Sequence, residues 1–157
     1  MPYQLHRIHQ LNCDLVTAWK FFSSPHNLSH ITPKEMKFTV QSNLPEESIY
    51  AGMIINYKVS PLLGIPMLWQ TRITQVDEGN SFTDIQQRGP YKLWNHFHEF
   101  IPNKYGVLMK DTVDYELPWG LIGSIVHSLL VRKKLNNIFD YRYQVLETLF
   151  NTQKITA

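Results

Sequence analysis

Two neighbouring stretches of the chain alternate between apolar and polar residues with the period of two that is typical of β-strands. In the stretch 105–117 the odd-numbered residues are apolar apart from Asp111, and the even-numbered ones are mostly polar. In the stretch 91–101 the even-numbered residues include Trp94, His96, His98 and Phe100. Pro102-Asn103-Lys104 lies between them and is typical of a turn. The pattern therefore predicts two long strands joined as an antiparallel hairpin.

Three polar side chains fall on the faces of this hairpin that we expect to point inward: His96, His98 and Asp111. A two-residue loop at 103–104 would place His98 opposite Met109 and His96 opposite Asp111, so that they share one face. A slip of one residue would turn all of them outward. Because burying an unpaired imidazole or carboxylate is costly, the pattern indicates a cavity lined in part by polar groups.

The rest of the chain predicts five further strands and three helices. Asp14 is a suitable N-cap for a short amphipathic helix through Phe22, and Pro25 suits the first turn of a second helix, which ends near Ile31. Apolar residues with helical spacing predict a third helix over 121–150, about 45 Å long at ~1.5 Å per residue. The last residues, 151–157, are expected to fray. The further strands are predicted at 3–11, 36–42, 52–60, 67–77 and 81–88.

The composition restricts the possible folds and partners but does not indicate a particular chemistry. The 157 residues fit one domain spanning 1–157, and the hydrophobic content of 43% allows a sizeable core. The formal net charge of +2 is too small to indicate nucleic-acid binding. The single cysteine, Cys13, excludes an intrachain disulfide. The first residues lack the apolar core of a signal peptide, and no run is long enough to cross a bilayer. We therefore expect a cytoplasmic protein without stable membrane insertion.

The order of strand, two short helices, six strands and a long helix predicts an α+β fold, in which a curved antiparallel seven-stranded sheet wraps around the C-terminal helix. This order resembles the helix-grip fold of the START-like, or SRPBCC, superfamily. Several segments are also similar to a bacterial branch of that superfamily described as ligand-binding or cyclase-like. They are GMIINY at 52–57, WQTRI at 69–73, QQRGPY at 86–91, WNHFH at 94–98, DTVDY at 111–115 and the pair Tyr141-Arg142. The resemblance implies an internal cavity and little specific chemistry.

Strand parity allows the lining of that cavity to be predicted. Its aromatic wall is expected to comprise Tyr57, Trp69, Phe82, Trp94 and Tyr115. Its polar interruptions are expected to be Thr71, Asp84, Gln86, His96, His98 and Asp111. Pockets for small ligands are mostly apolar with a few placed polar groups. The favoured function is therefore binding of a small hydrophobic or amphipathic ligand, such as a lipid, quinone, isoprenoid or polyketide.

Other functions are possible on the same residues. A His96–Asp111 pair could serve as acid and base in a cyclase- or dehydratase-like enzyme, or could be a buried pair that only stabilises the sheet. His96 and His98, two residues apart on one strand face, could bind a metal together with Asp111, although any alternating strand with two histidines gives this spacing. The sequence contains none of the common nucleophile, nucleotide, zinc-protease or paired-cysteine motifs. We therefore predict neither a cofactor nor a metal, and a small ligand as the partner.

Overall fold

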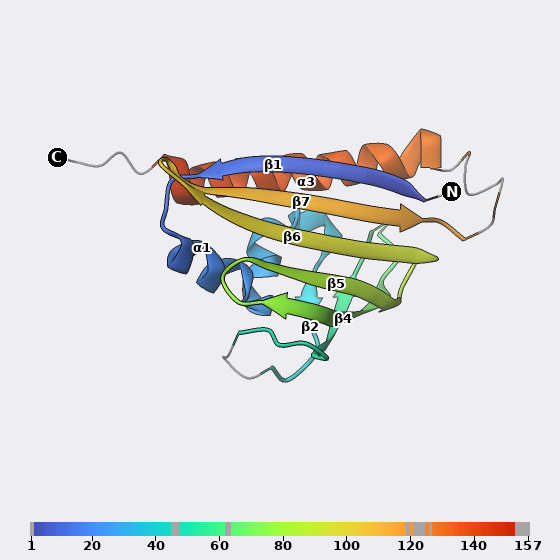
Figure 1. Ribbon diagram of the computed structural model, residues 1–157. Helices are drawn as coiled ribbons and strands as arrows, with labels where there is room; N and C mark the ends of the chain where they lie inside the picture. Colours follow the sequence, from blue (N-terminus) through green and yellow to red (C-terminus); the bar gives the residue numbers. More distant parts are fainter. Residues whose placement is uncertain are drawn as a thin grey trace.

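The computed structural model of the protein describes residues 2–44, 48–61, 64–118, 120, 125 and 127–152. Its main element is a seven-stranded antiparallel sheet with the strand order β1-β7-β6-β5-β4-β3-β2 (Figure 1). The first strand of the chain therefore pairs with the last, and the remaining strands follow one another as hairpins. The strands are β1 (Tyr3–Leu11), β2 (Thr39–Val40), β3 (Ile54–Val59), β4 (Met67–Asp77), β5 (Ser81–Arg88), β6 (Leu93–Asn103) and β7 (Gly106–Glu116).

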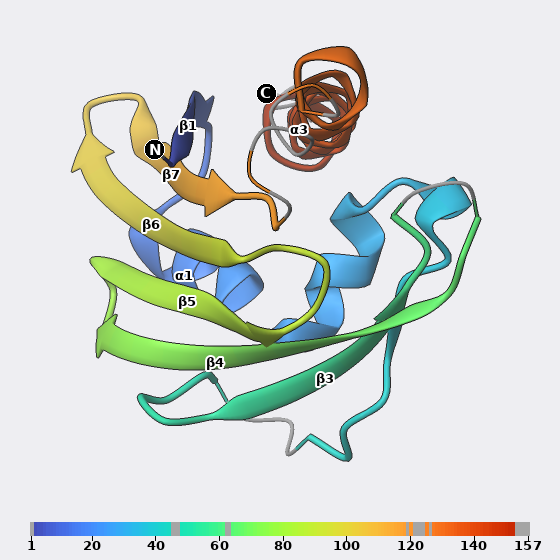
Figure 2. The same cartoon turned by 90° about the vertical axis from the view of Figure 1, so that its right-hand side faces the viewer.

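The helices lie on the concave side of this sheet, which bends strongly when seen along the C-terminal helix (Figure 2). The short elements after β1 are α1 (Leu15–Phe22), the 3₁₀ helix η1 (Pro25–Ile31) and the 3₁₀ turn η2 (Lys34–Met36). The C-terminal helix comprises α3 (Arg132–Leu146) between two π-helical turns, η3 (His127–Val131) and η4 (Glu147–Asn151). Asp14 caps α1 as predicted, since its Oδ1 accepts a hydrogen bond from the Thr17 amide at 2.7 Å.

The predicted α+β helix-grip architecture is confirmed by this element order and topology. Most of the predicted first turns of the long helix, from residue 121, lie outside the described residues, as does most of the predicted frayed end. The residues 127–151 are helical, as expected. No helix among the described residues is both long enough and apolar enough to cross a membrane.

The predicted register of the β6–β7 hairpin is wrong by two residues. The tip consists of Lys104 and Tyr105, and Asn103 pairs with Gly106. Asn103 closes this turn by accepting a hydrogen bond from the Tyr105 amide at 2.9 Å on its side-chain oxygen. Gly106 has a φ of 126°, and a Cβ there would lie 2.2 Å from the Leu11 carbonyl oxygen, so glycine is required at this end of the turn.

The shift changes the partners but not the faces, because an even shift keeps side-chain parity. His98 lies opposite Asp111, and His96 lies opposite Val113. His96, His98 and Asp111 are all buried, with at most 7% of their surface exposed. The prediction that the histidine face points inward is therefore confirmed. His96 does not lie directly opposite Asp111 as predicted, nor His98 opposite Met109, but His96 and Asp111 still form a hydrogen bond of 2.8 Å along the diagonal.

The predicted strand at 36–42 is also wrong in extent. Only Thr39 and Val40 pair with β3, while Met36 ends the 3₁₀ turn η2 and Lys37 follows in the left-handed conformation, with a φ of 48°. Met36 is buried from this turn, and its carbonyl accepts a hydrogen bond from the Ser60 amide at 2.7 Å. Packing of the Met36 side chain thus replaces strand pairing here. The predicted strand at 52–60 is shortened to β3.

Candidate functional site

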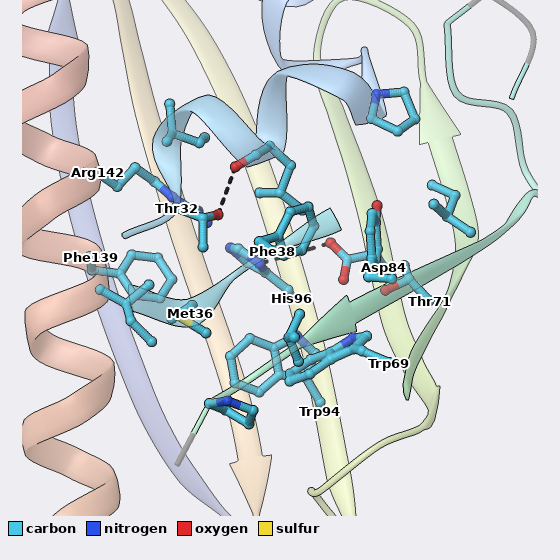
Figure 3. Close-up of a pocket in the computed structure, with 18 of the residues that line it drawn as sticks. Thr32, Met36, Phe38, Trp69, Thr71, Asp84, Trp94, His96, Phe139 and Arg142 are labelled. Atoms are coloured by element: carbon cyan, nitrogen blue, oxygen red, sulfur yellow. Dashed lines mark hydrogen bonds and ion pairs between the residues drawn. The ribbon is translucent and has the colours of Figure 1, made fainter. Parts of the chain in front are cut away.

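A cavity of about 210 Å³ lies between the concave face of the sheet and the helices (Figure 3). Strands β3 to β6 form one side, and the opposite side is formed by α3 with the end of α1, η1 and η2. Most lining side chains are apolar or aromatic, and Trp69 and Trp94 contact each other edge to face with ring centroids 5.2 Å apart. The polar lining residues are few: Ser24, Asn27, Thr32, Thr71, Asp84, His96, His98, Lys134 and Arg142, besides the tyrosines.

Four charged or titratable side chains on β5, β6 and β7 form one network, which we call the sheet cluster: Asp84, His96, His98 and Asp111. Asp84 pairs across the strands with His96, and His98 with Asp111. The hydrogen bonds run along the diagonals instead, from His96 Nε2 to Asp111 Oδ1 at 2.8 Å and from His98 Nε2 to Asp84 Oδ2 at 2.9 Å. The two imidazole rings lie 3.7 Å apart between the carboxylates. Each carboxylate is therefore bonded by the β6 histidine diagonal to it and not by the one directly opposite.

The second nitrogen of each imidazole also faces a carboxylate, but without a hydrogen bond. His98 Nδ1 lies 2.9 Å from Asp111 Oδ1 in a short ionic contact whose direction does not suit a hydrogen bond. His96 Nδ1 lies 3.8 Å from Asp84 Oδ2. A neutral His96 that donates through Nε2 carries a lone pair on Nδ1. Nδ1 and the Asp84 carboxylate are then both hydrogen-bond acceptors and repel each other, which is consistent with the longer distance between them.

The pKa values of the two histidines are shifted in opposite directions. Burial, together with the neighbouring His98, lowers the pKa of His96 despite its bond to Asp111. Burial also opposes charging of His98, but its contacts with Asp111 and Asp84 outweigh burial and raise the pKa of His98. Burial alone would raise the pKa of Asp111, yet the contacts with both histidines hold it well below its usual range. These shifts favour a neutral His96 and a protonated His98 between the two carboxylates.

The helical side of the cavity carries a different kind of buried charge. Arg142 of α3 is 8% exposed, lines the cavity and lies over the Phe139 ring, with Cζ 4.7 Å from the ring centroid. Its Nε is buried without a hydrogen-bond partner. Within the described part of the chain no salt bridge involves Arg142. Burial lowers the pKa of Arg142, while Asp111 and Asp84 act on it in the opposite direction.

The structure separates the predicted site residues into two groups. Those that line the cavity are Tyr57, Trp69, Thr71, Phe82, Asp84, Trp94, His96 and His98. Gln86, Asp111 and Tyr115 are not among the lining residues. Gln86 instead hydrogen-bonds the Tyr91 backbone at 2.7 and 3.2 Å, and Tyr115 packs against the rings of Tyr3 and Tyr91. Asp111 lies behind the two histidines and orients them.

Sequence reasoning missed Arg142 and most of the helical lining. The residues of the last helix that reach the cavity are Val131, Lys134, Leu135, Ile138, Phe139 and Arg142. Their spacing of three and four residues is that of one helix face. Continuing the apolar stripe from Phe139 toward Leu146 would have reached Arg142, a charge at a position where the pattern expects an apolar residue.

Asp84, His96 and His98 could also hold a metal ion, since one potential ligand atom from each lies within 4.8 Å of the others. The alternative considered from the sequence had Asp111 as the third ligand, but the carboxylate of this set is that of Asp84, which lines the cavity. Zinc ligands lie about 2.0–2.2 Å from the ion, so these atoms would have to close around it. Asp111 would then orient the histidines from behind, as carboxylates commonly do at metal sites.

Comparison with solved structures finds the same fold at low sequence identity. A START superfamily protein from Mycobacterium smegmatis aligns with a TM-score of 0.70 and 12% identity over 96% of this chain and 99% of its own. Ginseng major latex-like protein 151 from Panax ginseng aligns with a TM-score of 0.68 and 16% identity over 96% of this chain and 98% of its own. A protein from Chromobacterium violaceum has a TM-score of 0.70 and 12% identity over 97% of this chain and 100% of its own.

No protein-family model matches the chain, and no curated protein matches it either. At identities this low the structural alignments establish the fold alone. They cover nearly the whole chain, and they agree with the strand order and the position of the terminal helix. The protein therefore has the helix-grip fold of the START-like, or SRPBCC, superfamily.

Proposed function

We propose that the protein binds a small hydrophobic or amphipathic ligand in the cavity between the sheet and the C-terminal helix. The observation that carries this proposal is the cavity itself, with aromatic and aliphatic walls interrupted by a few placed polar groups. Such a lining is typical of sites that enclose small molecules. Proteins of similar structure include a START superfamily protein, which supports the proposal at the level of fold.

The size of the cavity limits the ligand. A volume of about 210 Å³ is below the ~300–1,000 Å³ common for drug-sized ligands. Within the ligand classes considered from the sequence, this favours a compact molecule over a long-chain lipid. Trp69 and Trp94 are neighbours in its wall, so their fluorescence should report occupancy.

The test uses two adjacent residues on β3 that face opposite sides of the sheet. Ile55 is 1% exposed and lines the cavity, whereas Ile54 is 46% exposed. Native mass spectrometry and solvent extraction of the purified protein should identify a co-purifying ligand. The Ile55→Phe variant should then bind that ligand about tenfold or more weakly because the added ring fills the cavity, and Ile54→Phe should bind it normally. Equal binding by both variants would show that the ligand lies elsewhere.

A second candidate function is acid–base catalysis of the cyclase or dehydratase kind. The observation favouring it is that His96 lines the cavity and is hydrogen-bonded to Asp111 at 2.8 Å. His96 Nδ1 and the Asp84 carboxylate are the basic atoms directed away from Asp111, so a bound molecule would exchange protons with these. Turnover of the co-purifying molecule should then be lost in His96→Gln while binding persists. Unchanged turnover in that variant would remove this candidate.

The remaining features of the proposal follow from composition. The formal net charge of +2 supports a small-molecule partner over nucleic acid. The single cysteine, Cys13, supports a reducing compartment, and we propose a cytoplasmic location on that ground. Fractionation of cells that express the tagged protein would test the location directly.

A further inference from the structure

The helical wall of the cavity carries positive charge that the described protein does not neutralise by contact. Arg142 and Lys134 both line the cavity from α3, two turns apart. The described residues include no salt bridge to either of them. The Nε of Arg142 is buried without a hydrogen-bond partner. A buried guanidinium with an unused donor is costly in the empty protein, which points to a group that is supplied from outside.

The carboxylates of the sheet cluster do not supply that group. Asp111 accepts a hydrogen bond from His96 and contacts His98, and Asp84 accepts a hydrogen bond from His98 at 2.9 Å. In Figure 3, Arg142 enters from the helix on one side and Asp84 from the sheet on the other, with His96 drawn between them. The sheet side and the helical side thus present separate chemistry to a bound molecule.

The guanidinium of Arg142 also indicates the shape of the missing group. A guanidinium presents pairs of N–H donors in one plane, which match the two oxygens of a carboxylate. The Phe139 ring lies beneath the guanidinium, with Cζ 4.7 Å from its centroid, and covers one side of it. A planar, singly charged head fits this arrangement better than a tetrahedral, doubly charged phosphate, because Arg142 is the only buried cation on the described part of α3.

We propose that the cavity is selective for a compact monocarboxylate, with its carboxylate on the Arg142 fork and its apolar body against the aromatic wall. This inference rests on the proposed ligand-binding function and narrows it. Lys134, which is only half-buried, would assist entry of the anion without contacting it in the final position. The cavity volume of about 210 Å³ suits an aryl or short-chain alkyl acid.

The test compares acids with their neutral amides. The probes are 2-naphthoate with 2-naphthamide, and octanoate with octanamide, each titrated against the wild-type protein by calorimetry and tryptophan fluorescence. The acids should bind about tenfold or more tightly than the amides, because only the acids form a charge-assisted bidentate pair. Octyl phosphate should bind more weakly than octanoate.

Three variants locate the preference. Arg142→Met should bind acid and amide with similar affinity, and Arg142→Lys should keep part of the preference because it retains charge without the fork. The matched control is Arg7→Met, since Arg7 also contacts the Phe139 ring, with Cζ 6.0 Å from its centroid, but is absent from the cavity lining. Arg7→Met should leave the preference unchanged. Circular dichroism and thermal unfolding would establish that each variant is folded.

The outcomes separate this inference from the proposed function. If amides and acids bind the wild type equally, or if the preference survives in Arg142→Met, the cavity binds ligands but Arg142 does not select a carboxylate. Tighter binding of octyl phosphate than of octanoate would overturn the carboxylate assignment in favour of a phosphate. If none of the probes binds at concentrations up to about 1 mM, the selectivity is overturned, and the proposed ligand binding is then decided separately by the co-purifying ligand and the Ile55→Phe variant.

Discussion

The sheet wall and the helical wall of the cavity both bury charge, but only on the sheet wall do carboxylates and imidazoles contact each other directly. On the sheet, Asp84 and Asp111 are each in contact with both histidines. On the helix, Arg142 stacks on Phe139 and lacks an ionic partner among the described residues. The sheet cluster can therefore be explained by folding alone, whereas Arg142 is better explained by something that the cavity binds.

This difference gives opposite expectations for mutation. Removing one member of a satisfied buried network leaves its partners unpaired and is strongly destabilising. Removing a buried charge that has no partner relieves a desolvation cost and leaves nothing behind. Stability measurements on single variants can thus distinguish a structural charge from one kept for binding, before any ligand is known.

The largest effect is expected for Asp111→Asn in the sheet cluster. The variant loses the charge that faces both imidazoles, and we expect unfolding in urea to require about 3 kcal/mol less free energy. Asp114→Asn is the matched control, because Asp114 lies on the opposite face of β7 and, within the described part of the chain, its side chain accepts only from Gln4, at 2.7 Å. It should change the free energy of unfolding by less than about 1 kcal/mol. Similar losses in both variants would mean that the sheet cluster does not stabilise the fold.

The inward position of this cluster could be predicted from the sequence, although its pairing could not. Alternation along β6 and β7 places His96, His98 and Asp111 on buried faces whatever the exact partner, provided that the shift is even. The partner depends on the turn, where Asn103 bonds the Tyr105 amide and moves the tip by one residue. Two neighbouring turn positions can differ by a single hydrogen bond. The alternation of apolar and polar residues contains no information about that bond.

The polar chemistry of the helical wall was harder to predict, because it comes from a charged residue within the apolar stripe of α3. Arg142 occupies the inward stripe of α3, but an isolated arginine in a helix usually lies at the surface. Its burial depends on the tertiary arrangement of α3 over the sheet, which puts the Phe139 ring beneath the guanidinium. Met36 is a similar case, because its burial follows from a 3₁₀ turn in a stretch whose alternation predicted a strand. In both cases long-range packing, rather than local preference, decides the position.

The second prediction concerns Arg142→Met. Arg142→Met loses the stacking on Phe139 and the longer-range attraction of Asp111 and Asp84, but it also relieves the desolvation of the guanidinium. We therefore expect the free energy of unfolding of the ligand-free protein to stay equal or rise by about 1 kcal/mol. Urea unfolding of the ligand-stripped protein measures this directly. A loss of about 2 kcal/mol or more would show that Arg142 is structural, and the contrast between the two walls would disappear.

The third prediction uses pH to separate the contributions of the two neighbouring imidazoles, His96 and His98. The raised pKa of His98 means that the folded protein binds its proton more tightly than the unfolded chain, so this stabilisation is complete below about pH 6.5 and is lost as pH rises through the folded value. The lowered pKa of His96 acts in the opposite sense, because the unfolded chain gains its proton first and stability falls as pH drops below about 6.5. Each slope is at most about 1.4 kcal/mol per pH unit.

Variants assign these slopes to residues. In His98→Gln the loss of stability above pH 6.5 should diminish, and in His96→Gln the loss on the acidic side should diminish. Chemical unfolding at a series of pH values between about 5 and 8 is sufficient. If both variants change the same limb of the profile, the two imidazoles share one protonation state, and the assignment of a neutral His96 beside a charged His98 is wrong.

The smallest effect is expected for Asp140, the ionic partner of Arg7, which is the second arginine that contacts Phe139. Arg7 donates to Asn136 at 2.7 Å and lies 3.7 Å from an Asp140 carboxylate whose side chain is 63% exposed. Exposed pairs of this kind contribute about 0–1 kcal/mol, because water competes for both charges. We therefore expect Asp140→Asn to change the free energy of unfolding by less than about 0.5 kcal/mol.

The comparison with Arg142 is most direct in the pair of variants Arg7→Met and Arg142→Met, since both remove a guanidinium next to the same ring. Arg7 has polar partners and partial access to water, so its removal should cost stability by about 1 kcal/mol or less and leave ligand binding intact. Removal of Arg142 should leave stability intact and cost binding. Because the two substitutions are chemically identical, a reversal of this order would place the functional cation on β1 rather than on α3.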